Sequence, residues 1–295
     1  MTKKRKARIW SLSYLFIALG FLASAPASTS GQRVKKTPTP VFSYDWKKIP
    51  PTFGGNDFEA IWRVLFNTKS LLEKDEFETT SQFTDRITNR SAIKLGSTLT
   101  AADELIFVYR PTEPSPHGLW SEYDADRQVL TITVQTNKHE TYKYKSIGSD
   151  NPKITLFGTE TKPHKFEKGR SYAAKNSLGA KATVTQYFYS NFYLAITNIA
   201  DFVGYDKGFM SAEINLKLEV PADKARLLKS NLSVLYIADL IHPYYALGGN
   251  ELQTPTIADP AKTNVLDHYL VARVKAIWIF DRTTGEVLVK LSAKN

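Results

Sequence analysis

Apolar residues between positions 56 and 90 recur with the period of an α-helix. One stripe follows i, i+3, i+4, i+7 and i+8 spacing and consists of Phe58, Ile61, Trp62, Leu65 and Phe66. Asp57 stands just before this stripe, where a capping side chain is expected. The run Thr79-Thr80-Ser81-Gln82 has the pattern of a capping box and indicates the start of a second helix. We therefore predict a small helical pair within residues 56–100.

From residue 101 onward, apolar residues alternate with polar ones or form short continuous runs, which is typical of strands. Turn-forming residues separate several of these segments and predict hairpins. The pattern predicts a mainly β (α+β) protein, with an antiparallel β-sandwich over residues 101–295 beside the N-terminal helical pair. The segments concerned are 105–109, 129–134, 214–220, 234–238 and 270–280, with hairpin turns at 123–127 and 281–285 and a short helix over 221–229.

The first 27 residues have the three parts of a secretory signal. Five cations within Lys3–Arg8 precede an apolar run that ends in Ala25-Pro26-Ala27. We predict a cleaved signal peptide over residues 1–27 and an exported protein, periplasmic or extracellular. The alternative is an uncleaved inner-membrane anchor, since residues 9–27 are just long enough to cross a bilayer. Residues 28–55 are rich in Pro, Thr and Lys and are predicted to form a solvated linker.

The positive charge of the chain is concentrated in these N-terminal segments. The formal net charge is +10, but residues 1–48 hold ten of the 39 Lys and Arg residues and one of the 29 Asp and Glu residues. The remainder is close to neutral, so the charge does not indicate nucleic-acid binding. The chain contains no cysteine, which excludes disulfides, thiolate metal sites and a cysteine nucleophile.

One basic stretch remains in the predicted β domain. Residues 138–181 contain ten cations and four carboxylates, interleaved with aromatic residues. Cations beside rings can hold an anionic polymer or a lipid surface; alternatively, lysines keep exposed strand edges from pairing with other chains. The nearby tyrosines are predicted to share one strand face, either as sheet packing or as a strip for carbohydrate or a partner protein. The candidate patch is Lys143, Lys145, Lys165, Lys168, Arg170, Tyr187 and Tyr189.

No metal or cofactor site is predicted, because the five histidines are scattered and no nucleotide-binding loop is present. Ser91-Ala92-Ile93-Lys94, Ser149-Asp150-Asn151 and Lys262-Thr263-Asn264 nevertheless follow the motif order of serine β-lactamases and penicillin-binding proteins. The context argues against that chemistry, since strands are predicted after Ser91 and Lys262 is predicted in a loop. A serine acyl-transferase or hydrolase using Ser91 and Lys94 is kept as the rival hypothesis.

The segment Lys74–Arg86 resembles a Glu-Phe-Glu-Thr…Phe…Arg stretch that recurs in uncharacterised exported bacterial proteins. The resemblance covers this segment alone and implies a bacterial envelope protein without implying an activity. We predict an exported, non-enzymatic interaction or structural component of the bacterial cell envelope. Its expected partner is an envelope protein or an anionic envelope polymer, with a lipid surface as the alternative; nucleic acid is not expected, and the membrane is contacted through an uncleaved N-terminal segment if at all.

Overall fold

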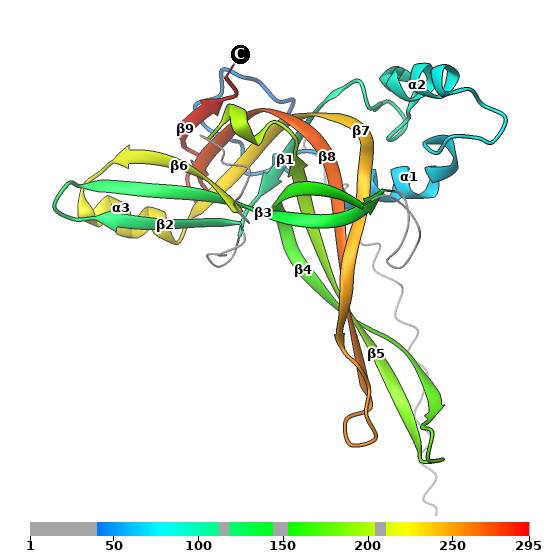
Figure 1. Cartoon of the computed structure of the whole chain (residues 1–295). Coiled ribbons are helices and arrows are strands. Elements are labelled where there is room, and N and C mark those ends of the chain that lie inside the picture. Colours follow the sequence, from blue (N-terminus) through cyan, green and yellow to red (C-terminus); the bar gives the residue numbers. More distant parts are fainter. Residues whose placement is uncertain (1–39, 112–117, 144–152, 204–210, 295) are drawn as a thin grey trace, which may run out of the picture. The chain divides into compact units, whose positions relative to one another are not determined.

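The computed structural model describes residues 40–111, 118–143, 153–203 and 211–294, and of residues 140–143, 153 and 154 it describes the backbone alone. Figure 1 shows the chain coloured from its N-terminus to its C-terminus. The helices are α1 (Phe58–Asn67), α2 (Thr80–Thr88) and α3 (Ala222–Lys229), with short 3-10 turns η1 (Lys69–Leu71), η2 (Arg90–Ala92) and η3 (Ile199–Asp201). The strands are β1 (Glu104–Tyr109), β2 (Leu119–Asp124), β3 (Val129–Lys143), β4 (Lys153–Lys175), β5 (Lys181–Ile196), β6 (Ser211–Glu219), β7 (Leu232–Gln253), β8 (Ala261–Asp281) and β9 (Val287–Ser292).

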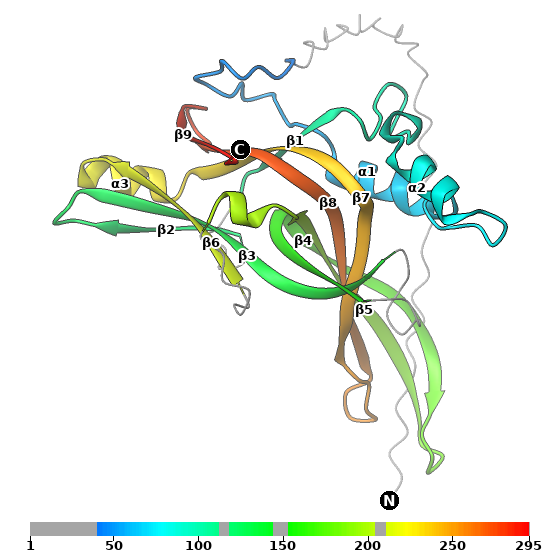
Figure 2. The same cartoon turned by 45° about the horizontal axis from the view of Figure 1, so that its top comes forward.

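The nine strands belong to one sheet whose pairings close into a ring. β7 pairs with β3, β3 with β4, β4 with β5, β5 with β8, and β8 returns to β7. β1 and β9 extend the sheet beside β7 and β8, and β2 and β6 flank the first half of β3. Two views show the long strands curving around a common interior (Figures 1 and 2).

The mainly β character is confirmed, but the antiparallel sandwich does not describe this sheet. β5 and β8 run parallel from Thr185 to Ile196 and from Ala261 to Ala272, so the sheet is mixed. The parallel pairing was not predicted, because alternation of apolar and polar residues indicates which face of a sheet a side chain occupies. It does not indicate which strand is the neighbour or in which direction that strand runs. Long strands such as β3 and β8 also change neighbours along their length, which a pattern of short strands does not show.

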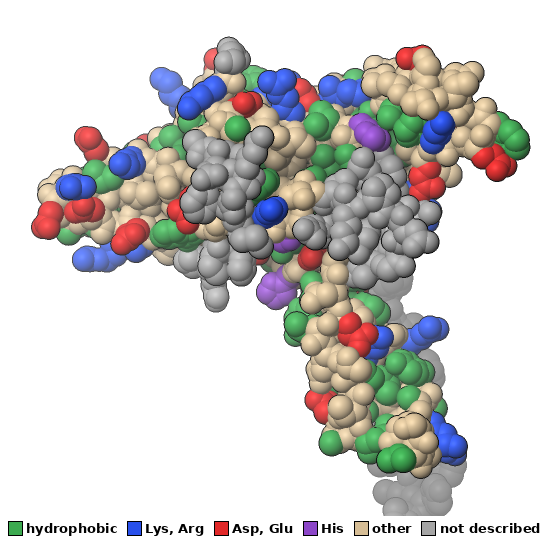
Figure 3. Space-filling view, in the orientation of Figure 1, with side chains coloured by type: hydrophobic (Ala, Val, Ile, Leu, Met, Phe, Trp, Pro, Cys, Tyr) green, Lys and Arg blue, Asp and Glu red, His purple; other side chains and the backbone are tan. Residues whose placement is uncertain are grey.

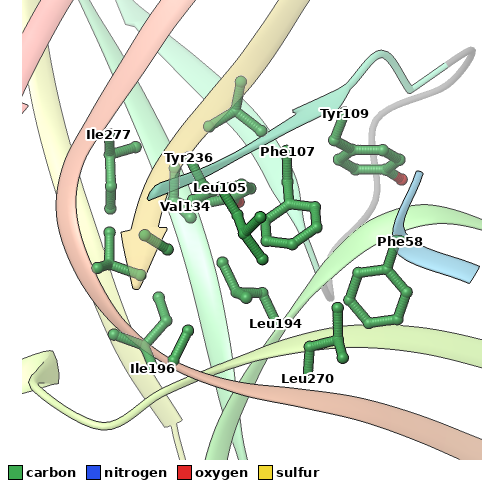
Figure 4. Close-up of a cluster of buried hydrophobic side chains, with 14 of the residues drawn as sticks. Phe58, Leu105, Phe107, Tyr109, Val134, Leu194, Ile196, Tyr236, Leu270 and Ile277 are labelled. Atoms are coloured by element: carbon green, nitrogen blue, oxygen red, sulfur yellow. The ribbon is translucent and has the colours of Figure 1, made fainter. Parts of the chain in front are cut away.

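The main core collects buried side chains from α1, α3 and most strands of the sheet. The run Val234–Ala238 of β7 is fully buried, as its continuous apolar sequence predicts. Figure 4 shows Tyr236 with Leu105, Leu194 and Ile277, which arrive from four different strands. Burying one such side chain contributes about 1.5–3 kcal/mol, so this cluster provides much of the driving force for folding.

The two predicted N-terminal helices are present, with the predicted caps. The Asp57 carboxylate accepts hydrogen bonds from the first turn of α1, and the Thr79 and Gln82 side chains form a reciprocal capping box at α2. The apolar stripe of α1 packs into the main core. In the segment that resembles exported bacterial proteins, Arg86 of α2 pairs with Glu78 and also donates to the Glu73 carbonyl oxygen at 2.9 Å, so it ties α2 to the connection between the helices.

Helices of the described residues are too short or too polar to cross a membrane. The predicted signal peptide, residues 1–27, lies outside the described residues.

The described end of the predicted linker is packed against the sheet. Ile49 and Phe53 are buried, and Phe42 and Trp46 pack with them against Trp278 of β8. The Ile49 amide donates to the carbonyl oxygen of Gly285 at 2.7 Å. Residues 40–55 therefore belong to the folded unit. The Pro, Thr and Lys content of 28–55 indicated a solvated segment, although Phe42, Tyr44 and Trp46 alternate within it.

Four strands continue beyond the core as two adjacent hairpins, which we call the arm. The arm consists of β4–β5 from Lys165 to Ser190 and β7–β8 from Gly249 to Leu266, joined through the parallel β5–β8 pairing. Both views show the hairpin ends side by side and away from the helices (Figures 1 and 2). The sequence analysis did not predict the arm, because its strands lack a sustained apolar face.

Candidate binding surface

Three aromatic rings, one exposed and two half-buried, form a cluster on one face of the arm. The ring of Phe166 lies 5.4 Å from that of Tyr187 with an interplanar angle of 10°, and 4.8 Å from that of Tyr189. Phe166 is 54% exposed, which is high for a phenylalanine in a strand. The predicted shared face of the two tyrosines is confirmed, and the partner that joins them, Phe166 of β4, was missed. We call Phe166, Tyr187 and Tyr189 the ring cluster.

One of the predicted cations, Lys168, lies beside the ring cluster, and a second, Arg170, follows it in β4. Lys168 is directly opposite Tyr187 in the β4–β5 pairing, so the two side chains project from the same face. Arg170 follows at an irregularity in the same strand. Both side chains are exposed and, within the described part of the chain, neither forms an ion pair. Their positive charges are thus available to an anion that contacts the rings.

Lys165 has a different role from the one predicted for it. Its ammonium group lies 2.8 Å from Glu59 of α1, and Lys162 contacts the other oxygen of the same carboxylate at 2.8 Å. Partial burial alone would raise the pKa of Glu59, but hydrogen bonds from the two lysines lower it to about 2. Lys165 therefore anchors α1 to the base of the arm.

The remaining two residues of the predicted patch are not placed. Lys143 ends β3, where the backbone alone is described, and Lys145 lies outside the described residues. The structure therefore divides the predicted patch into Lys168, Arg170, Tyr187 and Tyr189 on the arm and Lys165 at its base.

The base of the arm also holds a buried histidine. The His268 ring packs between Trp62, at 4.3 Å, and Phe192, at 5.1 Å between centroids. Burial lowers the pKa of His268 to about 4, so the side chain is neutral at physiological pH. Its Nδ1 atom is buried without a hydrogen-bond partner among the described residues. The stability of the α1–arm junction should therefore depend on pH through His268 and Glu59.

A polar pair extends the aromatic face toward the core. Asn191 follows Tyr189 by two positions, on the same face of β5, and its Nδ2 donates to Oδ1 of Asp267 at 2.8 Å. Burial raises the pKa of Asp267, although the hydrogen bond from Asn191 opposes that effect. An amide and a carboxyl beside aromatic rings can recognise hydroxyl groups, as sugar-binding surfaces do. Neither residue was singled out from the sequence, because they lie 76 positions apart.

The residues of the rival acyl-transfer hypothesis lie in separate elements. Ser91 is in η2 and Lys94 follows it; both are exposed, and no hydrogen bond joins them in the structure as described. Lys262 was predicted in a loop but lies in β8 of the arm, where its ammonium group is 2.7 Å from Glu251. Ser149, Asp150 and Asn151 fall outside the described residues.

Within the described part of the chain, no group of three or more His, Asp or Glu residues could hold a metal ion.

In comparisons with known proteins, no family model, curated protein or solved structure matches the chain. The resemblance of Lys74–Arg86 to exported bacterial proteins therefore stays a prediction, and the functional argument rests on the geometry of the arm.

Proposed function

We propose that this protein is an exported, non-enzymatic interaction component of the bacterial cell envelope, and that the face of its arm binds an anionic polymer. The signal-like N-terminal sequence supports export. The observation that carries the proposal is the ring cluster, in which an exposed Phe166 packs against the half-buried Tyr187 and Tyr189, with Lys168, which forms no ion pair among the described residues, directly opposite Tyr187.

An acidic polysaccharide fits this surface by three kinds of contact. Sugar rings pack on the apolar surface of Phe166, Tyr187 and Tyr189, and carboxylates or phosphates of the polymer pair with Lys168 and Arg170. The extended strand face suits a chain-like ligand, because successive contacts follow the strand direction. Hydroxyl groups of the polymer find donors and acceptors in the neighbouring Asn191–Asp267 pair.

The proposal is tested by measuring binding to polygalacturonate, with uncharged dextran as the matched polymer. Tyr187→Ala/Tyr189→Ala and Lys168→Glu/Arg170→Glu are each expected to weaken binding to polygalacturonate by about tenfold or more, and the wild-type affinity should fall as salt is raised. Lys224→Glu/Lys229→Glu, a matched reversal of two exposed charges on α3, should leave binding unchanged.

Two results would contradict the proposal. One is equal binding of polygalacturonate by the wild type and both arm variants; the other is an equal loss in the arm variants and the α3 control, which would indicate non-specific charge attraction. Lys165→Glu is unsuitable for this test, because it breaks the contact with Glu59 and disturbs the α1–arm junction.

A further inference from the structure

The end of the arm exposes aliphatic side chains from two different hairpins. Leu178, in the β4–β5 turn, is 92% exposed, and Leu252 and Ile257, at the β7–β8 end, are 63% and 48% exposed. The two hairpin ends line a shared hollow of about 390 Å³, which places them next to each other. Figure 3 shows hydrophobic side chains gathered at this end of the arm with Lys and Arg side chains at its edge. We call Leu178, Leu252 and Ile257 the apolar tip.

The turn that carries Leu178 is rigidly built. The Asn176 side chain accepts hydrogen bonds from the amides of Leu178 and Ala180 at 3.1 and 2.9 Å, and Gly179 supplies the positive φ of 89° that closes the turn. Polar residues are usual at such a position, and a leucine held outward loses favourable burial. The turn therefore holds Leu178 outward, where its side chain is available for an apolar contact outside the chain.

The second hairpin end is ordered in a similar way. The amide of Thr256 donates to the Asp259 carbonyl at 2.8 Å, and the side chain of Gln253 donates to the Asp259 carboxylate at 2.6 Å. Leu252 lies at an irregularity between the paired residues Glu251 and Gln253, a place where the direction of a side chain is altered. The Asp259 carboxylate thus has a hydrogen-bond donor within its own hairpin. Leu252, beside it, has its side chain exposed.

Two lysines beside the apolar tip indicate the charge of what it contacts. Lys175 and Lys181 lie directly opposite each other in the β4–β5 pairing, both are exposed, and neither forms an ion pair in the described structure. Like charges at directly opposite positions destabilise a strand pair. An anionic surface at this end would remove that repulsion, because each ammonium group would gain a phosphate partner.

We propose that the apolar tip docks on an anionic phospholipid bilayer. Leu178, Leu252 and Ile257 enter the interfacial region, while Lys175 and Lys181 contact lipid phosphates. The tip is built from other residues than the ring cluster, so this contact is separate from polymer binding. Such docking would hold the aromatic face of the arm close to the membrane surface.

The absence of cysteine from the chain permits a local test. An environment-sensitive dye is attached to Leu178→Cys in the full chain and, as a control, to Leu227→Cys, a 70% exposed leucine on α3. A local probe is needed because the cations of Lys3–Arg8 also attract anionic vesicles. Vesicles of phosphatidylglycerol and phosphatidylcholine should shift the dye emission at position 178 to shorter wavelength and leave position 227 unchanged. Vesicles of phosphatidylcholine alone should give a much smaller shift.

The charge requirement is tested in the same labelled protein. Lys175→Gln/Lys181→Gln should lower the apparent vesicle affinity at position 178 by roughly thirtyfold, since each lysine near an anionic surface contributes about fivefold. Lys224→Gln/Lys229→Gln on α3 is the matched control and should have no effect.

Three outcomes would overturn the proposal: no shift at position 178, equal shifts at positions 178 and 227, or a shift that requires added envelope protein, which would assign the tip to a protein partner. Polygalacturonate binding is measured in parallel, so that failure of tip docking can be told apart from failure of polymer binding.

Discussion

The two halves of β7 show how differently the core and the arm are built. In the core half, Val234–Ala238 is fully buried on both faces of the sheet. In the arm half, which pairs with the start of β8, Leu252 is exposed and polar residues stand on both sides of it. The core half is held mainly by burial of apolar surface, and the arm half mainly by backbone hydrogen bonds of the sheet.

This contrast suggests that the core side chains determine the stability of the fold and that the exposed arm side chains determine what the protein binds. Side chains of the core have their contacts within the protein, so their replacement affects folding. Phe166 and the aliphatic side chains at the end of the arm are largely open to solvent, and their replacement should affect what the protein binds. Two phenylalanines on different strands allow this difference to be measured directly.

The largest expected effect is that of truncation in the core. Phe107→Ala removes a ring that is 2% exposed and lies 5.7 Å from Phe58, and it should lower the free energy of unfolding by about 3–5 kcal/mol. Phe166→Ala, the matched change in the arm, should cost less than about 1 kcal/mol because that ring is more than half exposed. Urea unfolding of both variants measures the difference. Equal losses would show that the ring cluster is part of the cooperative core.

An intermediate effect is expected where the arm depends on close backbone approach. Gly249 of β7 has a φ of 127°, and a Cβ atom there would overlap the carbonyl oxygen of Val265 in β8. Gly249→Ala should therefore weaken the β7–β8 pairing of the arm by about 1–3 kcal/mol.

Hydrogen exchange locates the effect of Gly249→Ala. Amides of the β7–β8 arm should exchange faster, while those of Val234–Ala238 keep their protection, because local opening need not unfold the core. Gly54→Ala is the matched control, since a Cβ atom there meets nothing within 4 Å. Loss of protection throughout the sheet would contradict the separation of arm and core.

The sequence predicted the core better than the arm for a physical reason. Helix caps, hairpin turns and the buried run 234–238 depend on neighbouring residues, so local patterns reveal them. The arm strands carry polar residues on both faces and give no such pattern. Gly248 and Gly249, for example, have no strand pattern around them, although both lie within β7.

The candidate surface was predicted only in part, because local patterns reveal some of its contacts and not others. Alternation placed Tyr187 and Tyr189 on one face, which the contacts with Phe166 confirm. It could not show that Lys165 pairs with Glu59, because the two residues are 106 positions apart and meet only through packing of α1 on the arm. Long-range ion pairs of this kind leave no local signature in a sequence.

The smallest expected effect lies at the α1–arm junction, where core and arm meet. The pKa of Glu59 is lowered to about 2 and that of His268 to about 4, so in both cases the unfolded state takes up a proton at higher pH than the folded state. Acid therefore weakens the junction through both groups, by breaking the lysine contacts of Glu59 and by forcing a proton onto the buried ring of His268. Stability falls between about pH 6.5 and 4 because the unfolded state binds a proton at His268 before the folded state does, and the contribution of Glu59 is lost as pH falls from about 4.5 to 2.

Two substitutions separate these steps. Glu59→Gln should lower stability at neutral pH by about 1 kcal/mol and abolish the acid-side loss below pH 4.5, whereas His268→Gln should abolish the loss between pH 6.5 and 4. Unfolding midpoints and exchange of α1 amides across pH measure both effects. Glu167→Gln is the control. It changes an exposed carboxylate on β4, the strand that carries Lys165, and should leave the dependence of stability on pH unchanged. If Glu59→Gln leaves α1 exchange unaltered at every pH, the lysine contacts do not hold α1 to the arm, and the helix is held there by aromatic packing, which includes the contact of Trp62 with His268.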